Sequence, residues 1–205
     1  MDEKDVDREI TKFFQSQGAI PSARPISRSI FDTGCSFHGA GIRCLTSVPN
    51  DDGTVAMPTS PAITCYAFAA ELYIKALLQS DGVNAKGHKL HLLYGRLAPE
   101  IKDRVFAKYV SLLPGRTSEQ FRVDLGQISN AFVDWRYIFE QSDIAIPLHR
   151  LVAFAWSLFS SIKDVKPNWS VQRDMDKRLA EKPDLSALRI IGIGGGRMLM
   201  LKMKN

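Results

Sequence analysis

The sequence predicts a mainly α-helical protein with one domain, built as an antiparallel helical bundle. Its 205 residues suit a single domain with short appendages. Hydrophobic residues make up 45% and charged residues 24% of the chain, the balance of an ordinary globular protein. Several apolar segments have a helical period and are joined by short loops, which favours neighbouring helices that run in opposite directions.

Residues 1–18 are predicted to form an amphipathic helix. Four apolar residues fall on one of its faces: Val6, Ile10, Phe13 and Phe14. Gly18 ends the helix, and Pro21 and Pro25 prevent an early restart.

Residues 19–59 are predicted to be irregular, because they show no helical period and are rich in Gly, Pro, Ser and Thr. The sequence Asn50-Asp51-Asp52-Gly53 is a turn signal between two short extended pieces, so a small β-hairpin is expected there.

Three possible metal ligands occur in the same segment: Cys35, His38 and Cys44. Structural zinc usually takes four ligands with paired short spacings, and only one short pair is present here. We therefore interpret the cysteines as free thiols in a loop, and we expect no metal and no cofactor.

Residues 60–163 are predicted to be the helical bundle. Ser60 is a good N-cap and Pro61 suits the first helical position. From Ala62 to Leu78 the only charged residues are Glu71 and Lys75. A helix that is apolar nearly all round is buried on most sides, so the helix near residues 61–79 is expected to form the centre of the core.

The remaining helices are predicted from the spacing of their apolar residues, from N-cap residues and from helix-breaking Pro and Gly. They are predicted at residues 88–97, 99–113, 117–141 and 148–163, with a polar helix at 171–181. Residues 164–205 then comprise this polar helix and a basic, Gly-containing tail. Gly192 to Gly196 do not fit a nucleotide-binding loop, since Arg197 replaces the last glycine and too few residues follow. We therefore expect a flexible tail, which is either a solvated end or a contact for phosphates.

A group of polar residues accompanies the apolar helix. Glu71 and Lys75 lie one turn apart on it, and His88, Arg136 and Glu140 follow on later elements. Buried charges are costly unless they are paired, so Glu71 or Lys75 should contact His88 or the helix that carries Arg136. Two interpretations remain open, a structural ion-pair network and a polar groove that binds phosphate or nucleotide.

At these residues the sequence resembles HEPN-domain proteins, which are nucleotide- and RNA-associated helical bundles. The matching segments are AAELYIKALL (residues 69–78), KGHKLHLLYGRL (residues 86–97) and AFVDWRYIFE (residues 131–140). The resemblance covers about residues 60–163. It implies a HEPN-type bundle that forms homodimers and binds nucleotide or RNA, with Glu71, Lys75, His88, Arg136 and Tyr137 as ligand-binding residues.

Many HEPN proteins are metal-independent ribonucleases with an Arg, four to six residues, and then a His. Arg136 has Gln141, Ser142 and Asp143 at these distances. We therefore expect a non-catalytic module that binds RNA, a nucleotide or a partner protein in a prokaryotic defence or toxin–antitoxin system. One alternative is a divergent ribonuclease with His88, Arg136 and Glu140 as catalytic residues, and another is a purely structural interaction domain.

The chain opens MDEKDVDREI, which is acidic where a signal peptide would be basic and then apolar. Its longest apolar stretch is interrupted by Pro147, His149 and Arg150 and is too short to span a bilayer. We therefore expect a cytoplasmic protein with no membrane partner.

Overall fold

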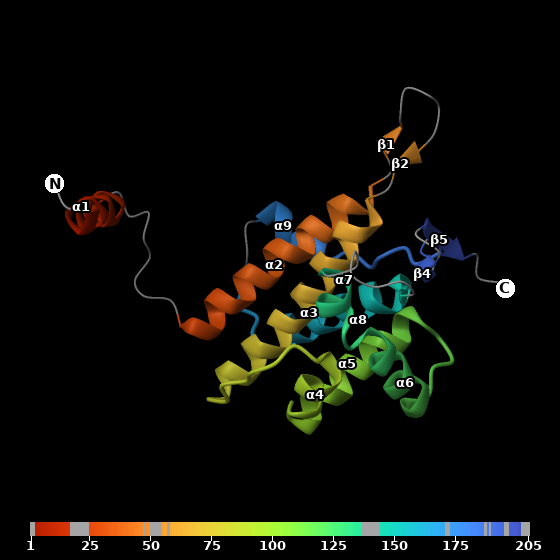
Figure 1. Cartoon of the computed structure of the whole chain (residues 1–205). Coiled ribbons are helices and arrows are strands. Elements are labelled where there is room, and N and C mark those ends of the chain that lie inside the picture. The colour runs from red at the N-terminus through yellow and green to blue at the C-terminus, as the bar shows by residue number, and fades with distance from the viewer. Residues whose placement is uncertain are drawn as a thin grey trace.

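The protein is mainly α-helical, and helices α2 to α9 pack together in the computed structural model (Figure 1). The structure describes residues 3–16, 25–46, 48–49, 55–56, 58–136, 144–170, 173–186, 188, 190–194 and 197–201. The helices are α1 (Glu3–Ser16), α2 (Ile26–Cys44), α3 (Thr59–Ser80), α4 (Leu90–Gly95), α5 (Pro99–Leu112), α6 (Ser118–Ile128), α7 (Ala131–Arg136), α8 (Leu148–Val165) and α9 (Arg173–Ala180). The strands are β1 (Val48–Pro49), β2 (Val55–Ala56), β3 (Ile144–Pro147), β4 (Ile190–Gly194) and β5 (Arg197–Leu201).

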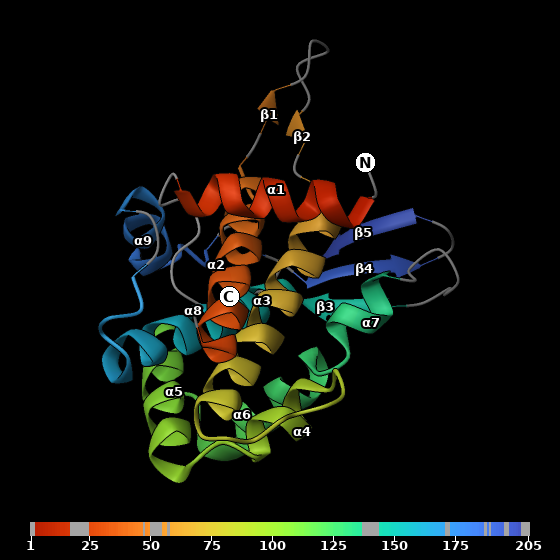
Figure 2. The same ribbon diagram turned by 90° about the vertical axis from the view of Figure 1, so that its left-hand side faces the viewer.

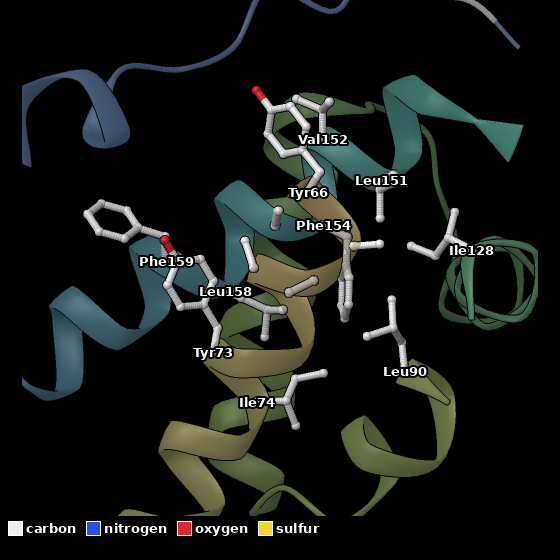
Figure 3. Packing of buried hydrophobic residues seen from close by; sticks show 14 of the residues in the cluster. Tyr66, Tyr73, Ile74, Leu90, Ile128, Leu151, Val152, Phe154, Leu158 and Phe159 are labelled. Carbon is white, nitrogen blue, oxygen red and sulfur yellow. The ribbon is translucent and has the colours of Figure 1, made fainter. Parts of the chain in front are cut away.

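Helix α3 forms the centre of the core, as its composition predicted. It packs against α2, α7 and α8, and most of its side chains are buried. Figure 3 shows side chains from α3, α4 and α6 meeting those of α8, with Leu90 and Ile128 beside Phe154. By length and composition α3 could cross a membrane, but 67% of its most apolar stretch is buried inside the protein, as in a core helix.

Helix α2 corrects the prediction that residues 19–59 are irregular. It lies along α3 in two views at right angles (Figures 1 and 2). A Cβ atom added to Gly34 would lie 3.0 Å from the Tyr73 ring, and one added to Gly41 would lie 2.9 Å from the Tyr66 ring. These glycines therefore permit close helix packing instead of breaking the helix, and the packing outweighs their low helix propensity. Further along, β1 and β2 pair antiparallel where the hairpin was predicted.

The helix predicted at residues 117–141 is also wrong, because α6 ends at Ile128 and α7 starts at Ala131. At the break, the carbonyl of Ser129 accepts from the backbone N–H of Leu90 at 3.1 Å, and its Oγ accepts from the N–H of His91 at 3.2 Å. Ser129 thus satisfies two donors at the start of α4, which ties α4 to the break. Helix α4 begins at Leu90, so His88 precedes it in an extended segment. The helices predicted at 61–79, 99–113 and 148–163 agree with α3, α5 and α8 within two residues.

The tail also differs from its prediction, since residues 190–194 and 197–201 form strands β4 and β5. Strand β4 pairs antiparallel with both β3 and β5, and Ile146 of β3 lies opposite Ile191. Isoleucine is β-branched and favours strands, and this pairing gives the isoleucines of the tail a partner strand. Gly195 and Gly196 lie outside the described residues.

Candidate functional site

The site begins with Glu71, a carboxylate on the central helix that is only 1% exposed. Lys75 lies one turn further along α3 and places its Nζ 2.8 Å from Glu71 Oε1. The lysine side chain is 20% exposed, so part of it reaches the surface. This pair neutralises an acid that would otherwise be an isolated buried charge.

His88 supplies the second partner of Glu71. Its Nδ1 lies 3.0 Å from Oε1 and 3.1 Å from Oε2 of Glu71. The predicted contact between the polar residues of α3 and His88 is confirmed. Gly87 has φ +95°, a backbone conformation that favours glycine, and it turns the chain immediately before His88.

The contact with Glu71 fixes which nitrogen of His88 carries a proton. A carboxylate can only accept, so Nδ1 donates, and Nε2 is then the acceptor of a neutral ring. Nε2 has no partner in the part of the chain that the structure describes. The His88 side chain is 52% exposed, so a large part of the ring can contact a ligand.

Aromatic rings support His88 from one side. Its ring centroid lies 6.0 Å from that of Phe132 on α7, and Phe132 stacks on Phe68 of α3 at 4.7 Å. Phe37 of α2 meets Phe68 edge-on at 4.6 Å. This row of rings links the orientation of His88 to the packing of three helices.

A pocket of about 430 Å³ opens beside His88, which we call the His88 pocket. Its lining residues are Lys86, Gly87, His88, Lys89, Leu92, Leu93, Asn130, Val133 and Asp134. Lys86 and Lys89 bring positive charge to the same segment as His88. Asp134 of α7 also lines the pocket, and burial raises the pKa of its carboxyl group. The pocket therefore combines two ammonium groups, an imidazole nitrogen and one carboxyl group.

The other predicted site residues cannot be added to this geometry. Arg136 is the last residue of α7, the helix that carries Asp134, but its side chain lies outside the description. Tyr137 and Glu140 lie outside the described residues. Their roles in binding or catalysis stay predictions.

The candidate metal ligands lie on helix α2, so the predicted loop is wrong, whereas the cysteines are free thiols as predicted. The Tyr73 hydroxyl lies 3.1 Å from His38 Nδ1 and donates to Cys35 Sγ at 3.6 Å. Burial lowers the pKa of His38 to about 3, which keeps its ring neutral. No group of three or more His, Cys, Asp or Glu that could hold a metal occurs in the described ranges.

Sequence reasoning missed a second buried carboxylate, Asp124 of α6, which is 2% exposed. Tyr109 of α5 donates its hydroxyl proton to Oδ2 at 2.9 Å. Arg150 of α8 lies 2.8 Å from Oδ1, and Arg116 lies 3.4 Å from Oδ2. The available signal was the position of Asp124 on the apolar face of α6, beside Leu125.

No protein-family model, no curated protein and no solved structure matches the chain. The fold and the geometry above are therefore the basis for a function.

Proposed function

We propose that the chain is a HEPN-like antiparallel helical bundle that binds RNA or a nucleotide through its phosphates and does not cleave it. One observation carries this proposal: Glu71 holds His88 by Nδ1 at the wall of a pocket that Lys86 and Lys89 also line. We extend the proposal to a homodimer in a prokaryotic defence or toxin–antitoxin system, as the HEPN resemblance implies, and to a cytoplasmic location.

The charges around the His88 pocket support an anionic ligand. Lys75 is already paired with Glu71, so it serves to neutralise the buried acid. Lys86 and Lys89 have no ion pair with another described residue, and both are exposed. Ammonium groups of this kind bind phosphates as point charges and give binding that weakens with salt.

The lack of an Arg-to-His spacing at Arg136 supports binding without cleavage. The Glu71–His88 pair favours one other candidate, the divergent metal-independent ribonuclease. A histidine whose Nδ1 is held by a carboxylate can accept and release a proton through Nε2. Such a ribonuclease would need further groups that reach the same phosphate, and Arg136 and Glu140 are the proposed ones.

The test is fluorescence anisotropy with a labelled single-stranded RNA oligonucleotide, together with a gel assay for cleavage of the same RNA without metal. We expect weak binding whose affinity falls as salt rises. Lys86→Ala and His88→Ala should weaken binding, and Lys86→Ala should lower the salt slope by about one. Arg104→Ala is the matched control, because Arg104 is an exposed cation on α5 outside this pocket.

The outcomes separate three functions. Cleavage that both His88→Ala and Arg136→Ala abolish would make the ribonuclease correct. Equal binding by Lys86→Ala, His88→Ala and Arg104→Ala would place RNA elsewhere on the surface and contradict the proposal. Absence of cleavage and of salt-sensitive binding would favour a structural interaction domain.

A further inference from the structure

We propose that a second cavity binds a small ligand with a flat aromatic ring and one negative group, such as an aromatic carboxylate. The cavity measures about 560 Å³, which suits a small-molecule site. We call it the α4–α6 pocket. Its lining residues are Lys89, His91, Tyr94, Gly95, Lys102, Asp103, Phe106, Ser118, Phe121, Arg122, Leu125, Gly126, Ser129 and Asn130.

The inner wall of this pocket is aromatic. The Tyr94 and Phe121 rings meet at 75° with centroids 5.6 Å apart, and Phe106 lies 5.5 Å from Phe121. The Tyr94 hydroxyl donates to the carbonyl of Lys102 at 2.9 Å, which fixes the ring against α5. Tyr94 and Phe121 are only 9% and 6% exposed, so they form a fixed apolar wall against which a flat ring can pack.

The rim of the pocket is positive. Lys89, Lys102 and Arg122 contribute three cations, against the single carboxylate of Asp103. Arg122 shares its charge with Glu119 at 2.7 Å, but Lys89 and Lys102 have no ion pair among the described residues. The rim therefore favours a ligand with a negative group.

His91 and Ser129 form a hydrogen-bonded pair at this rim. His91 Nδ1 lies 2.5 Å from Ser129 Oγ, and the same oxygen accepts from the backbone N–H of His91. The ring of His91 is thus held at the edge of the pocket, and its Nε2 has no partner in the described part of the chain.

Two glycines, Gly95 and Gly126, line the pocket. A Cβ added to Gly126, inside α6, or to Gly95, at the end of α4, would meet no atom within 4 Å. Glycine inside a helix is less stable than alanine by about 1 kcal/mol, and here no neighbour requires it. The space around both positions is therefore open, and a large side chain at either one would enter the pocket.

The combination of wall and rim selects the ligand class. A neutral hydrocarbon would have no negative group to pair with the cations of the rim. A phosphate chain would place charged oxygens against the apolar wall of Tyr94, Phe106 and Phe121. A flat ring with one anionic group uses both parts of the pocket.

The experiment is a fluorescence titration with 8-anilinonaphthalene-1-sulfonate, an aromatic anion that becomes bright in apolar sites. The wild type should bind it saturably at one site. Gly126→Phe fills the pocket and should weaken binding about tenfold or more, whereas the matched Gly126→Ala should bind as the wild type does. Lys102→Ala should weaken binding about threefold, and Lys108→Ala, on the same helix outside the pocket, should not.

Displacement tests the need for the charge. Naphthalene-1-carboxylate should displace the probe, and naphthalene-1-carboxamide should do so poorly. Gly95→Phe provides a second filled pocket if Gly126→Phe does not fold, as judged by its thermal melt. Equal binding by the filled and alanine variants would place the probe elsewhere, such as on the exposed Phe13 of α1, and would overturn the proposal. No saturable binding by the wild type, or equal displacement by acid and amide, would also overturn it.

Discussion

Two buried carboxylates, Glu71 and Asp124, are equally hidden from solvent but have different partners. Asp124 is held by Tyr109, Arg116 and Arg150, and the two arginines are only 27% and 18% exposed. Glu71 is held by Lys75 and by His88, which is 52% exposed. Asp124 is enclosed by its partners, whereas Glu71 has one partner that faces solvent.

This difference shows that burial of an acid does not by itself mark a functional site. Asp124 joins α5, α6 and α8 through the residues that surround it, so its network is structural. Glu71 orients a histidine whose side chain is half exposed. The exposure of the partner residues therefore distinguishes the Glu71 region from the Asp124 region. The predictions below compare buried charges by their effect on the free energy of unfolding.

The largest loss of stability should come from introducing a buried carboxylate that has no partner. Ala76 is fully buried on α3, and Ala76→Asp would place a carboxylate among apolar side chains. We expect a loss of about 3–5 kcal/mol in the free energy of unfolding, measured by urea denaturation. Arg136→Ala, the comparison, should lose far less. Near wild-type stability of Ala76→Asp would mean that this face of α3 is open to water.

The second prediction compares the two carboxylates with matched neutral variants. Asp124→Asn removes the charge that both arginines contact, and we expect it to cost about 3 kcal/mol. Glu71→Gln should cost about 1 kcal/mol, because the half-exposed His88 can turn to water. Equal losses in urea denaturation would show that the Glu71 cluster is as structural as the Asp124 cluster.

The sequence predicted those features that depend on residues close together in the chain. Helices α3, α5 and α8 follow from apolar composition and from Pro61 and Pro99 near their starts. The contact between Glu71 and His88 could also be predicted, because a buried acid needs a partner and few candidates were near. Predicting this contact did not require knowledge of the whole fold.

Features that depend on distant residues could not be predicted. The buried face of α2 consists largely of small and polar residues such as Gly34, His38 and Gly41, and only the rings of α3 show that they are packed. The break after α6 depends on α4, and the strands of the tail depend on β3. The Asp124 cluster unites residues from three helices and a loop, which no short motif reveals.

The third prediction concerns the loss of stability at low pH that the buried histidines cause. Burial lowers the pKa of His38 to about 3, whereas an unfolded histidine titrates near 6.5. The unfolded chain therefore binds a proton first, so the stabilisation is complete above about pH 6.5 and is lost as pH falls towards 3. Burial, with Arg150 and Arg116, likewise lowers the pKa of His149 to about 4.

We expect His38 alone to account for a loss on the order of 2 kcal/mol between pH 7 and pH 5. Urea denaturation of His38→Gln across this range should show a shallower fall than the wild type. The matched control is Leu92→Gln, since Leu92 is exposed and neither residue titrates, so the slope should stay as in the wild type. Parallel slopes for all three proteins would contradict the neutral, buried state of His38.

The smallest effect on stability should come from His88, and it follows from the same comparison. Half of this side chain is in solvent, so its contact with Glu71 is screened by water and contributes little. After His88→Ala, Glu71 keeps its bond to Lys75, and water can reach the vacated position. We expect a loss below about 1 kcal/mol in urea denaturation. The matched variant is Tyr109→Phe, which removes one hydrogen bond from the enclosed Asp124 and should cost about 1.5–3 kcal/mol. A larger loss for His88→Ala than for Tyr109→Phe would mean that His88 is a structural support of Glu71, and its role would then match that of the residues around Asp124.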